Sequence, residues 1–117
     1  MTDMGIVVVG AAGRTGSRIT SLALRDPSVA LVGAAVRAGS PLIGTPVDVS
    51  RPSVRYTTLA DAPTPSVVID FSTPDALAQT ARFATDRGAA LVIGTTGLSS
   101  EHDAIMRVSS AIVPVLH

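Results

Sequence analysis

The chain has 117 residues, of which 46% are hydrophobic and 3% aromatic, so it is long enough for one small domain with an aliphatic core. Nine basic and nine acidic residues cancel, which argues against binding nucleic acid or an anionic membrane through bulk positive charge. No cysteine is present to form disulfides, and no apolar run of about 18 residues predicts a membrane span. The opening "MTDMG" lacks the basic and apolar regions of a signal peptide, so a cytoplasmic protein is the default expectation.

The first third of the chain alternates strand and helix patterns. Residues 5–10, "GIVVVG", form an apolar run typical of a buried strand. Residues 14–25 follow the helical period and end before Pro27, with an inner face predicted at Ile19, Leu22 and Ala23. A second strand is predicted over residues 30–36, "ALVGAAV".

The middle of the chain has no clear period. Residues 37–55 are rich in proline, glycine and serine and predict a long surface loop. A short strand at residues 56–57 and a brief helical turn over residues 59–62 are expected to follow it.

The last part returns to alternation. Strands are predicted over residues 66–71 and 90–94, and a last one over "AIVPVLH", residues 111–117. Between the first two, a helix has Thr73 as N-cap and Pro74 at its first position. The inner face of this helix is predicted at Leu77, Ala81 and Ala84, and Gly88 is expected to end it. Ser99 or Ser100 is predicted to cap another helix.

This alternation predicts one α/β domain over residues 1–117, a Rossmann-like doubly wound parallel sheet that binds NAD(P). Ligands of such sheets bind where loops leave the carboxyl ends of the strands. The candidate loops are "GAAGRTG", "RAGS", "DFSTPD" and "GTTG".

The first loop contains Gly10, Gly13 and Gly16, a variant of the dinucleotide fingerprint. Gly10 permits a tight turn, Gly13 lets backbone N–H groups approach a pyrophosphate, and Gly16 lets the helix pack on the strand. The helix N-terminus adds partial positive charge and free N–H groups. The alternative is a tight strand-to-helix turn without a ligand.

The second strand lacks the acid that reads the ribose hydroxyls in NAD-preferring sheets, and Arg37 stands there instead. Arg37 can pair with a 2′-phosphate, with Arg14 as a second donor, which favours NADPH or a dual preference. The alternative is that Arg37 is a solvated loop residue.

The two later loops carry other candidates. In "GTTG", two glycines flank two hydroxyls that can approach a carboxamide or carboxylate, unless this is a plain turn. Asp70 is a candidate catalytic carboxylate, but ordering of its own loop is the favoured role. Phe71 either packs near a nicotinamide or fills core. His102 is expected on an exposed helix turn, and no residue spacing predicts a metal site, a nucleophile elbow or a P-loop.

Together, "VVVGAAGRTGSRI", "VIDFSTPDAL" and "LVIGTTGLSSE" resemble the N-terminal domain of the 4-hydroxy-tetrahydrodipicolinate (dihydrodipicolinate) reductase family. The resemblance implies reduction of a cyclic unsaturated dicarboxylate with NADH or NADPH in lysine and diaminopimelate biosynthesis, by a homotetramer. It implies phosphate binding by residues 10–15, with Thr15 in place of a frequent methionine, and a nicotinamide beside residues 94–96. The predicted cofactor-binding residues are Gly10, Ala11, Ala12, Gly13, Arg14, Thr15, Arg37, Phe71, Gly94, Thr95 and Thr96.

The family's acid–base and substrate-carboxylate residues belong to a second domain that would follow His117. No catalytic residue is therefore assigned here, and we expect this chain to bind cofactor without turnover, to act with that missing substrate domain, and to self-associate as a homo-oligomer. Two alternatives remain. One is a non-catalytic NAD(P)-sensing or interaction module. The other is an atypical short-chain dehydrogenase, because "GAAGRTGS" also resembles the opening of those proteins.

Overall fold

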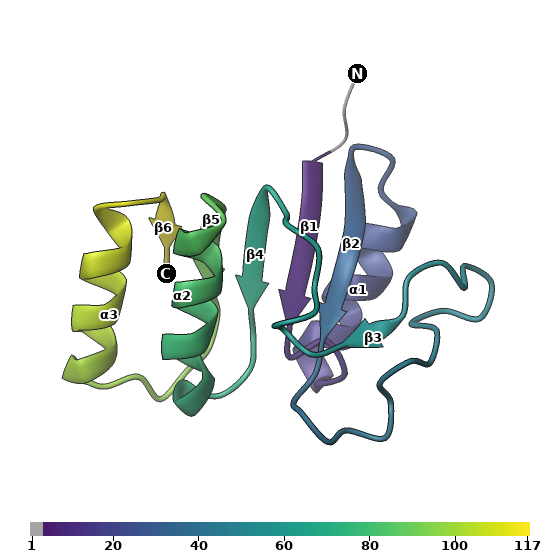
Figure 1. The fold of residues 1–117 in the computed structure, drawn as a ribbon, viewed down its shortest axis with the longest axis horizontal. Helices are drawn as coiled ribbons and strands as arrows, with labels where there is room; N and C mark the ends of the chain where they lie inside the picture. The colour runs from purple at the N-terminus through teal and green to yellow at the C-terminus, as the bar shows by residue number, and fades with distance from the viewer. Residues whose placement is uncertain (1–3) are drawn as a thin grey trace.

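The computed structural model describes residues 4–117, so part of the segment assessed for a signal peptide lies outside the described residues. Six parallel strands form one sheet in the order β3-β2-β1-β4-β5-β6 (Figure 1). Because the order reverses between β1 and β4, this is a doubly wound sheet, as predicted. The strands are β1 (Met4–Val9), β2 (Val29–Ala35), β3 (Tyr56–Thr57), β4 (Val67–Asp70), β5 (Ala90–Ile93) and β6 (Val115–Leu116).

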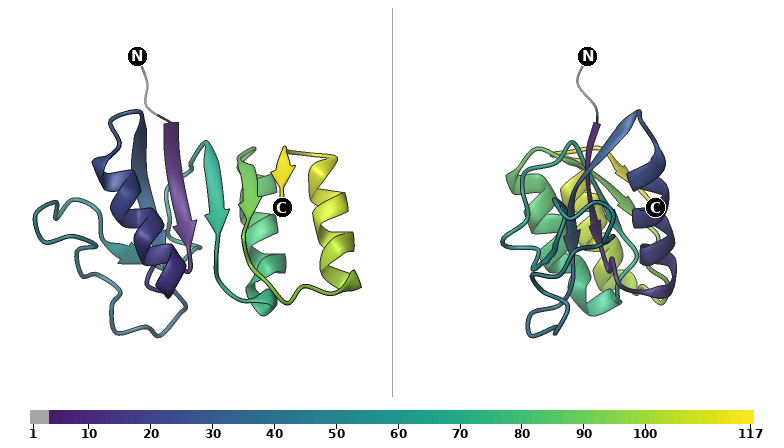
Figure 2. Two further views of the ribbon diagram at one scale, coloured as in Figure 1. Left: turned by 180° about the vertical axis from the view of Figure 1, so that it is seen from behind. Right: turned by 90° about the vertical axis from the view of Figure 1, so that its right-hand side faces the viewer.

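The helices cover both faces of the sheet. Helix α1 (Arg14–Arg25) lies on one face, while α2 (Leu77–Asp86) and α3 (Ser100–Ser110) lie on the other (Figure 2). A short 3-10 helix, η1 (Pro74–Ala76), leads directly into α2. Among residues 4–117, no helix is long and apolar enough to cross a membrane.

The core is aliphatic and lies on both sides of the sheet, because alternate residues of a strand point to opposite faces. Val7 and Val9 of β1 pack with the α2 side, where Leu77 and Leu91 are buried. Ile6 and Val8 belong to the cluster on the α1 side. The central strands are therefore buried on both faces, which explains their continuous apolar sequence.

The predicted inner face of α1 was wrong in one position. Leu22 is 60% exposed, whereas Gly16, Thr20 and Ala23 are buried and Ile19 is half-buried. The buried residues follow the spacing i, i+4, i+7, and Leu22 falls outside that stripe. A buried glycine and threonine at this face let the helix approach the sheet closely.

The other elements lie close to their predictions. Leu77, Ala81 and Ala84 are buried, and Gly88 ends α2 with φ +65°. Residues 59–62 form a hydrogen-bonded turn, as expected. The last strand is much shorter than residues 111–117, and the loop of residues 37–55 contains only one isolated bridge.

Candidate nucleotide-binding site

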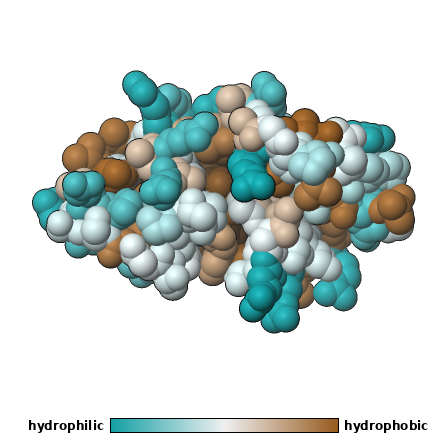
Figure 3. Space-filling model, turned by 90° about the horizontal axis from the view of Figure 1, so that it is seen from below, coloured by the Kyte–Doolittle hydropathy of each residue, from teal (hydrophilic) through white to brown (hydrophobic). Residues whose placement is uncertain are grey.

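Four strands end side by side at the edge where the predicted loops begin. In the sheet register, Val9 of β1 lies between Ala35 of β2 and Asp70 of β4, and Asp70 lies next to Ile93 of β5. The loops that follow these strands therefore meet at one edge, on both sides of the point where the strand order reverses. Figure 3 views this edge, where pale residues lie among strongly hydrophilic and hydrophobic ones.

The turn from β1 into α1 has a fixed backbone. The carbonyl of Ala35 accepts the N–H groups of both Gly10 and Ala11, each at 3.2 Å. Gly10 has φ +78°, and an added Cβ would lie 2.8 Å from the carbonyl oxygen of Phe71. Both the conformation and the close approach therefore require glycine at this position.

Gly16 brings helix α1 against this turn. A Cβ added to Gly16 would overlap the carbonyl oxygen of Gly10, which is a backbone atom and cannot move aside alone. A Cβ at Gly13 would lie only 3.2 Å from the same oxygen, and the N–H of Gly13 donates to it at 3.0 Å. The two glycines thus hold the start of the helix directly over the end of β1.

The first turn of α1 presents unpaired backbone donors. Ser17 is the first residue whose N–H pairs within the helix, with the carbonyl of Gly13 at 2.9 Å. Within residues 4–117, the N–H groups of Arg14, Thr15 and Gly16 have no recorded acceptor, as expected at a helix start. The N-cap, Gly13, has no side chain to compete for them. This geometry suits an anion such as a phosphate.

The predicted residues of this turn differ in what they expose. Ala12, Gly13, Arg14 and Thr15 are exposed, whereas Ala11 is fully buried and its N–H is already paired with Ala35. Ala11 therefore shapes the turn and offers no free donor to a ligand.

Arg37 lies just past the end of β2 and is exposed. Its carbonyl accepts the N–H of Ser40 at 3.2 Å, but its guanidinium has no recorded hydrogen bond to another described residue. No acidic side chain follows β2 at this point, since the next residues are Ala38 and Gly39.

Asp70 joins the loop after β4 to the loop after β5. Its Oδ1 accepts the N–H of Ser72 at 2.8 Å and the Ser72 hydroxyl, and the Thr95 hydroxyl lies 3.4 Å away. Its main-chain carbonyl accepts the N–H of Gly94 at 2.8 Å. The side chain is fully buried, and its Oδ2 has no partner in the described part of the chain. These contacts support the ordering role rather than a catalytic one.

Phe71 was expected either to pack near a nicotinamide or to fill the core, and the structure places it at the edge of the sheet. Phe71 is half-buried, and its ring lies against Gly94, where an added Cβ would overlap the ring. Gly94 is therefore small because an aromatic ring covers it. Of the two following threonines, Thr95 is buried with its hydroxyl turned toward Asp70, whereas Thr96 is exposed.

His102 differs from its prediction as an exposed helix residue. It is half-buried, its Nδ1 accepts the N–H of Ser99 at 2.9 Å, and its Nε2 lies 3.0 Å from the carbonyl of Pro74. The spacing Ser99-x-x-His102 is that of a capping box, which was the available sequence signal for this interaction.

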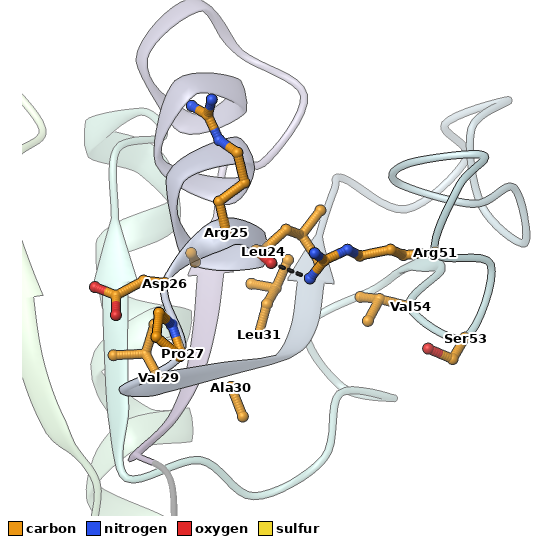
Figure 4. A pocket seen from close by; sticks show the side chains of 11 residues that line it. Leu24, Arg25, Asp26, Pro27, Val29, Ala30, Leu31, Arg51, Ser53 and Val54 are labelled. Atoms are coloured by element: carbon orange, nitrogen blue, oxygen red, sulfur yellow. Dashed lines mark hydrogen bonds between the residues drawn. The ribbon is translucent and has the colours of Figure 1, made fainter.

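Three hollows lie away from this edge. One of about 450 Å³ lies between α2 and α3, and one of about 310 Å³ between α1 and residues 47–56. A third, of about 390 Å³, lies at the end of α1, where Arg51 donates to the carbonyl of Leu24 (Figure 4). Arg51 thus connects the long loop to the far end of α1.

The strand order, the glycine turn and the polar loops at the switch point define a dinucleotide-binding α/β domain. The family described as "Dihydrodipicolinate reductase, N-terminus" matches residues 4–117, and the chain belongs to this family.

Individual relatives agree with this membership. The 4-hydroxy-tetrahydrodipicolinate reductase of Methanocorpusculum labreanum is 34% identical over 95% of this chain and 43% of its own length. That of Rhodopirellula baltica is 36% identical over 97% of this chain and 43% of its own. A dipicolinate-bound dihydrodipicolinate reductase from Paenisporosarcina has the same fold, with a TM-score of 0.68 at 16% identity over 92% of this chain and 44% of its own. The chain thus spans less than half of the relatives it matches.

Proposed function

We propose that this chain binds NADPH or NADH across the carboxyl edge of its sheet, as the cofactor half of a 4-hydroxy-tetrahydrodipicolinate reductase. In this role the cofactor would supply hydride to a cyclic unsaturated dicarboxylate in lysine and diaminopimelate biosynthesis. The observation that carries the proposal is the set of free N–H groups at Arg14, Thr15 and Gly16, held over the end of β1 by the glycine turn. Family membership supports the assignment of the anion as a dinucleotide pyrophosphate.

The arrangement of the edge supports one orientation of the dinucleotide. With the pyrophosphate at the start of α1, one end of the molecule extends over β2 toward Arg37, and the other over β4 and β5 toward Phe71 and Thr96. The guanidinium of Arg37 suits the adenosine end, and the flat ring of Phe71 with the hydroxyl of Thr96 suits the nicotinamide end. Gly94 and Thr95 would support that end from below, since Thr95 is buried.

Calorimetry with both reduced coenzymes tests the proposal directly. We expect both to bind, and NADPH more tightly, because Arg37 can pair with the 2′-phosphate. Arg37→Asp should weaken NADPH and spare NADH, while Arg82→Asp, an exposed change on α2, should alter neither. If neither coenzyme binds at millimolar concentration, the proposed function is wrong; if NADH binds as tightly as NADPH, only the preference is.

The chain alone is proposed to bind without turnover. Hydride transfer needs the nicotinamide and the substrate in contact, with a proton donor beside them. This edge supplies the nicotinamide side, and no acid–base pair is assigned to it. We expect no reductase activity from the isolated chain and recovery when a reductase substrate domain is added. Coenzyme binding without any such recovery would favour a non-catalytic sensing module instead.

Self-association is proposed from the apolar residues at one end of the sheet. Leu116 on the outermost strand β6 is 66% exposed, and Val108 and Ile112 nearby in sequence are 68% and 63% exposed. An open strand edge and exposed aliphatic side chains favour pairing with a second copy. Light scattering across a concentration series should show an oligomer, and Leu116→Lys should shift it toward monomer.

A further inference from the structure

His102 makes hydrogen bonds through both ring nitrogens. Its Nδ1 accepts the backbone N–H of Ser99 at 2.9 Å, and the Ser99 hydroxyl lies 3.0 Å from the same nitrogen. Its Nε2 lies 3.0 Å from the main-chain carbonyl of Pro74, 28 positions earlier in the chain. Because a carbonyl only accepts, Nε2 must carry the proton and Nδ1 must be the acceptor. The geometry therefore requires the neutral ring in a single tautomer.

A histidine at this position does more than cap the helix. The fourth position of a capping box is usually Glu or Gln, which accepts the N–H of the N-cap residue. A Glu carboxylate has acceptors only, so it would satisfy Ser99 but offer nothing to the carbonyl of Pro74. The imidazole of His102 serves both, and so joins the start of α3 to the start of η1.

The two segments that His102 joins are the loops on the β4 and β5 side of the site. Residues 71–73 link β4 to η1, and residues 94–99 link β5 to α3. Asp70 joins these loops at their inner ends through Ser72 and Thr95, and His102 joins them at their outer ends. Phe71 and Thr96, the groups that face the edge, lie between the two bridges in sequence.

We propose that His102 is a positioning residue, which holds the β4 and β5 loops in the arrangement that accepts the nicotinamide half of the coenzyme. This inference rests on the proposed function. A protein whose binding-competent arrangement is only partly populated binds its ligand more weakly by that fraction. Loss of the outer bridge lowers the population in which Phe71 and Thr96 are correctly placed. The adenosine half, which lies over β2, does not depend on this bridge.

The decisive variant is His102→Glu, measured in the full 117-residue chain. Glu keeps the acceptor for Ser99 and suits a helix N-terminus, so α3 stays capped and the protein stays folded. Only the donor to Pro74 is lost. His102→Gln restores both a donor and an acceptor, and His117→Glu places the same change at the exposed last residue. Two probes are used: NADPH, and adenosine 2′,5′-bisphosphate, which has no nicotinamide.

For His102→Glu we expect NADPH affinity to fall about three- to tenfold, the effect of one net hydrogen bond. Affinity for adenosine 2′,5′-bisphosphate should stay unchanged, His102→Gln should recover most of the loss, and His117→Glu should match the wild type. Nitrogen NMR of the wild-type ring should show an Nε2 proton that exchanges slowly with water because it is bonded to the carbonyl of Pro74, whereas the ring proton of a solvated histidine exchanges rapidly.

Three results overturn the proposal, and they are separable. If the wild type binds NADPH and His102→Glu binds it equally well, the outer bridge is irrelevant although the site is real. If His102→Glu weakens both probes in proportion, the residue acts on the whole fold rather than on the nicotinamide half. If the wild type binds neither probe, the proposed function fails and the positioning role fails with it.

Discussion

Replacing Gly16 with alanine tests the packing on which the whole site depends. In an ordinary helix, Gly→Ala stabilises the fold by about 0.5–1 kcal/mol, because alanine loses less backbone entropy. Here the new Cβ would overlap the carbonyl oxygen of Gly10, so α1 must move away from the β1 turn. Overpacking of this kind costs about 1–3 kcal/mol. We therefore expect a net loss of about 1–2 kcal/mol, the opposite sign from the helix-propensity effect.

Urea unfolding followed by far-UV circular dichroism measures this change, since the chain has no tryptophan and only one tyrosine. The midpoint should fall while the slope stays constant, which marks a change in stability alone. Ser21→Ala on the exposed face of α1 is the control and should stay within about 0.5 kcal/mol of the wild type. Gly16→Ala should also weaken NADPH binding, because the free N–H groups move with the helix. A variant as stable as the wild type, with unchanged NADPH affinity, would refute this account of the turn.

Three further predictions concern the loops. Asp70→Ala should destabilise by about 1–3 kcal/mol because it removes the acceptor of both half-buried Ser72 donors, while Asp70→Asn keeps an acceptor and should lose less, both measured by urea unfolding. Two hydrogen bonds from Ser50 hold the pKa of Asp48 below its usual value of 3.8. The contribution of Asp48 to folding stability is therefore complete above pH 3.8 and disappears as the pH falls through the lower pKa of the folded protein. When folding stability is measured at decreasing pH, Asp48→Asn should lose less stability over this range than the wild type. Arg51→Gln should cost about 0.3–1 kcal/mol and speed proteolysis of residues 37–55, because the contact with the end of α1 is lost; equal cleavage rates would contradict it.

The sequence predicted the sheet well because its strands are buried on both faces. Runs such as residues 5–10 can hardly occupy any other place in an α/β fold, and the glycine at position 16 follows from the need to pack a helix on a strand. Helix α1 was predicted with its full bounds, although Leu22 was assigned to the wrong side. The error arose because a three-residue spacing from Ile19 describes the edge of the stripe as well as its centre.

The contacts that organise the loops could not be predicted in this way. Thr95 and Asp70 are 25 positions apart, His102 and Pro74 28, and Arg51 and Leu24 27. Each pairing depends on which strand ends lie side by side, and that information exists only once the strand order is known. A local pattern therefore identified the polar residues, and the topology decided their partners.

The geometry of the edge suggests why such a site can survive extensive sequence change. Its main contacts to an anion would come from backbone N–H groups, whose placement depends on Gly10 and Gly16 and not on any ligand-contacting side chain. Asp70 likewise acts on the backbone, through Ser72 and Gly94. Under the proposed function, an exposed side chain such as Arg37 would be the group that sets which coenzyme is preferred. In the proposed function, affinity for the shared pyrophosphate and choice between coenzymes would be carried by separate groups, so variants of one should leave the other nearly intact.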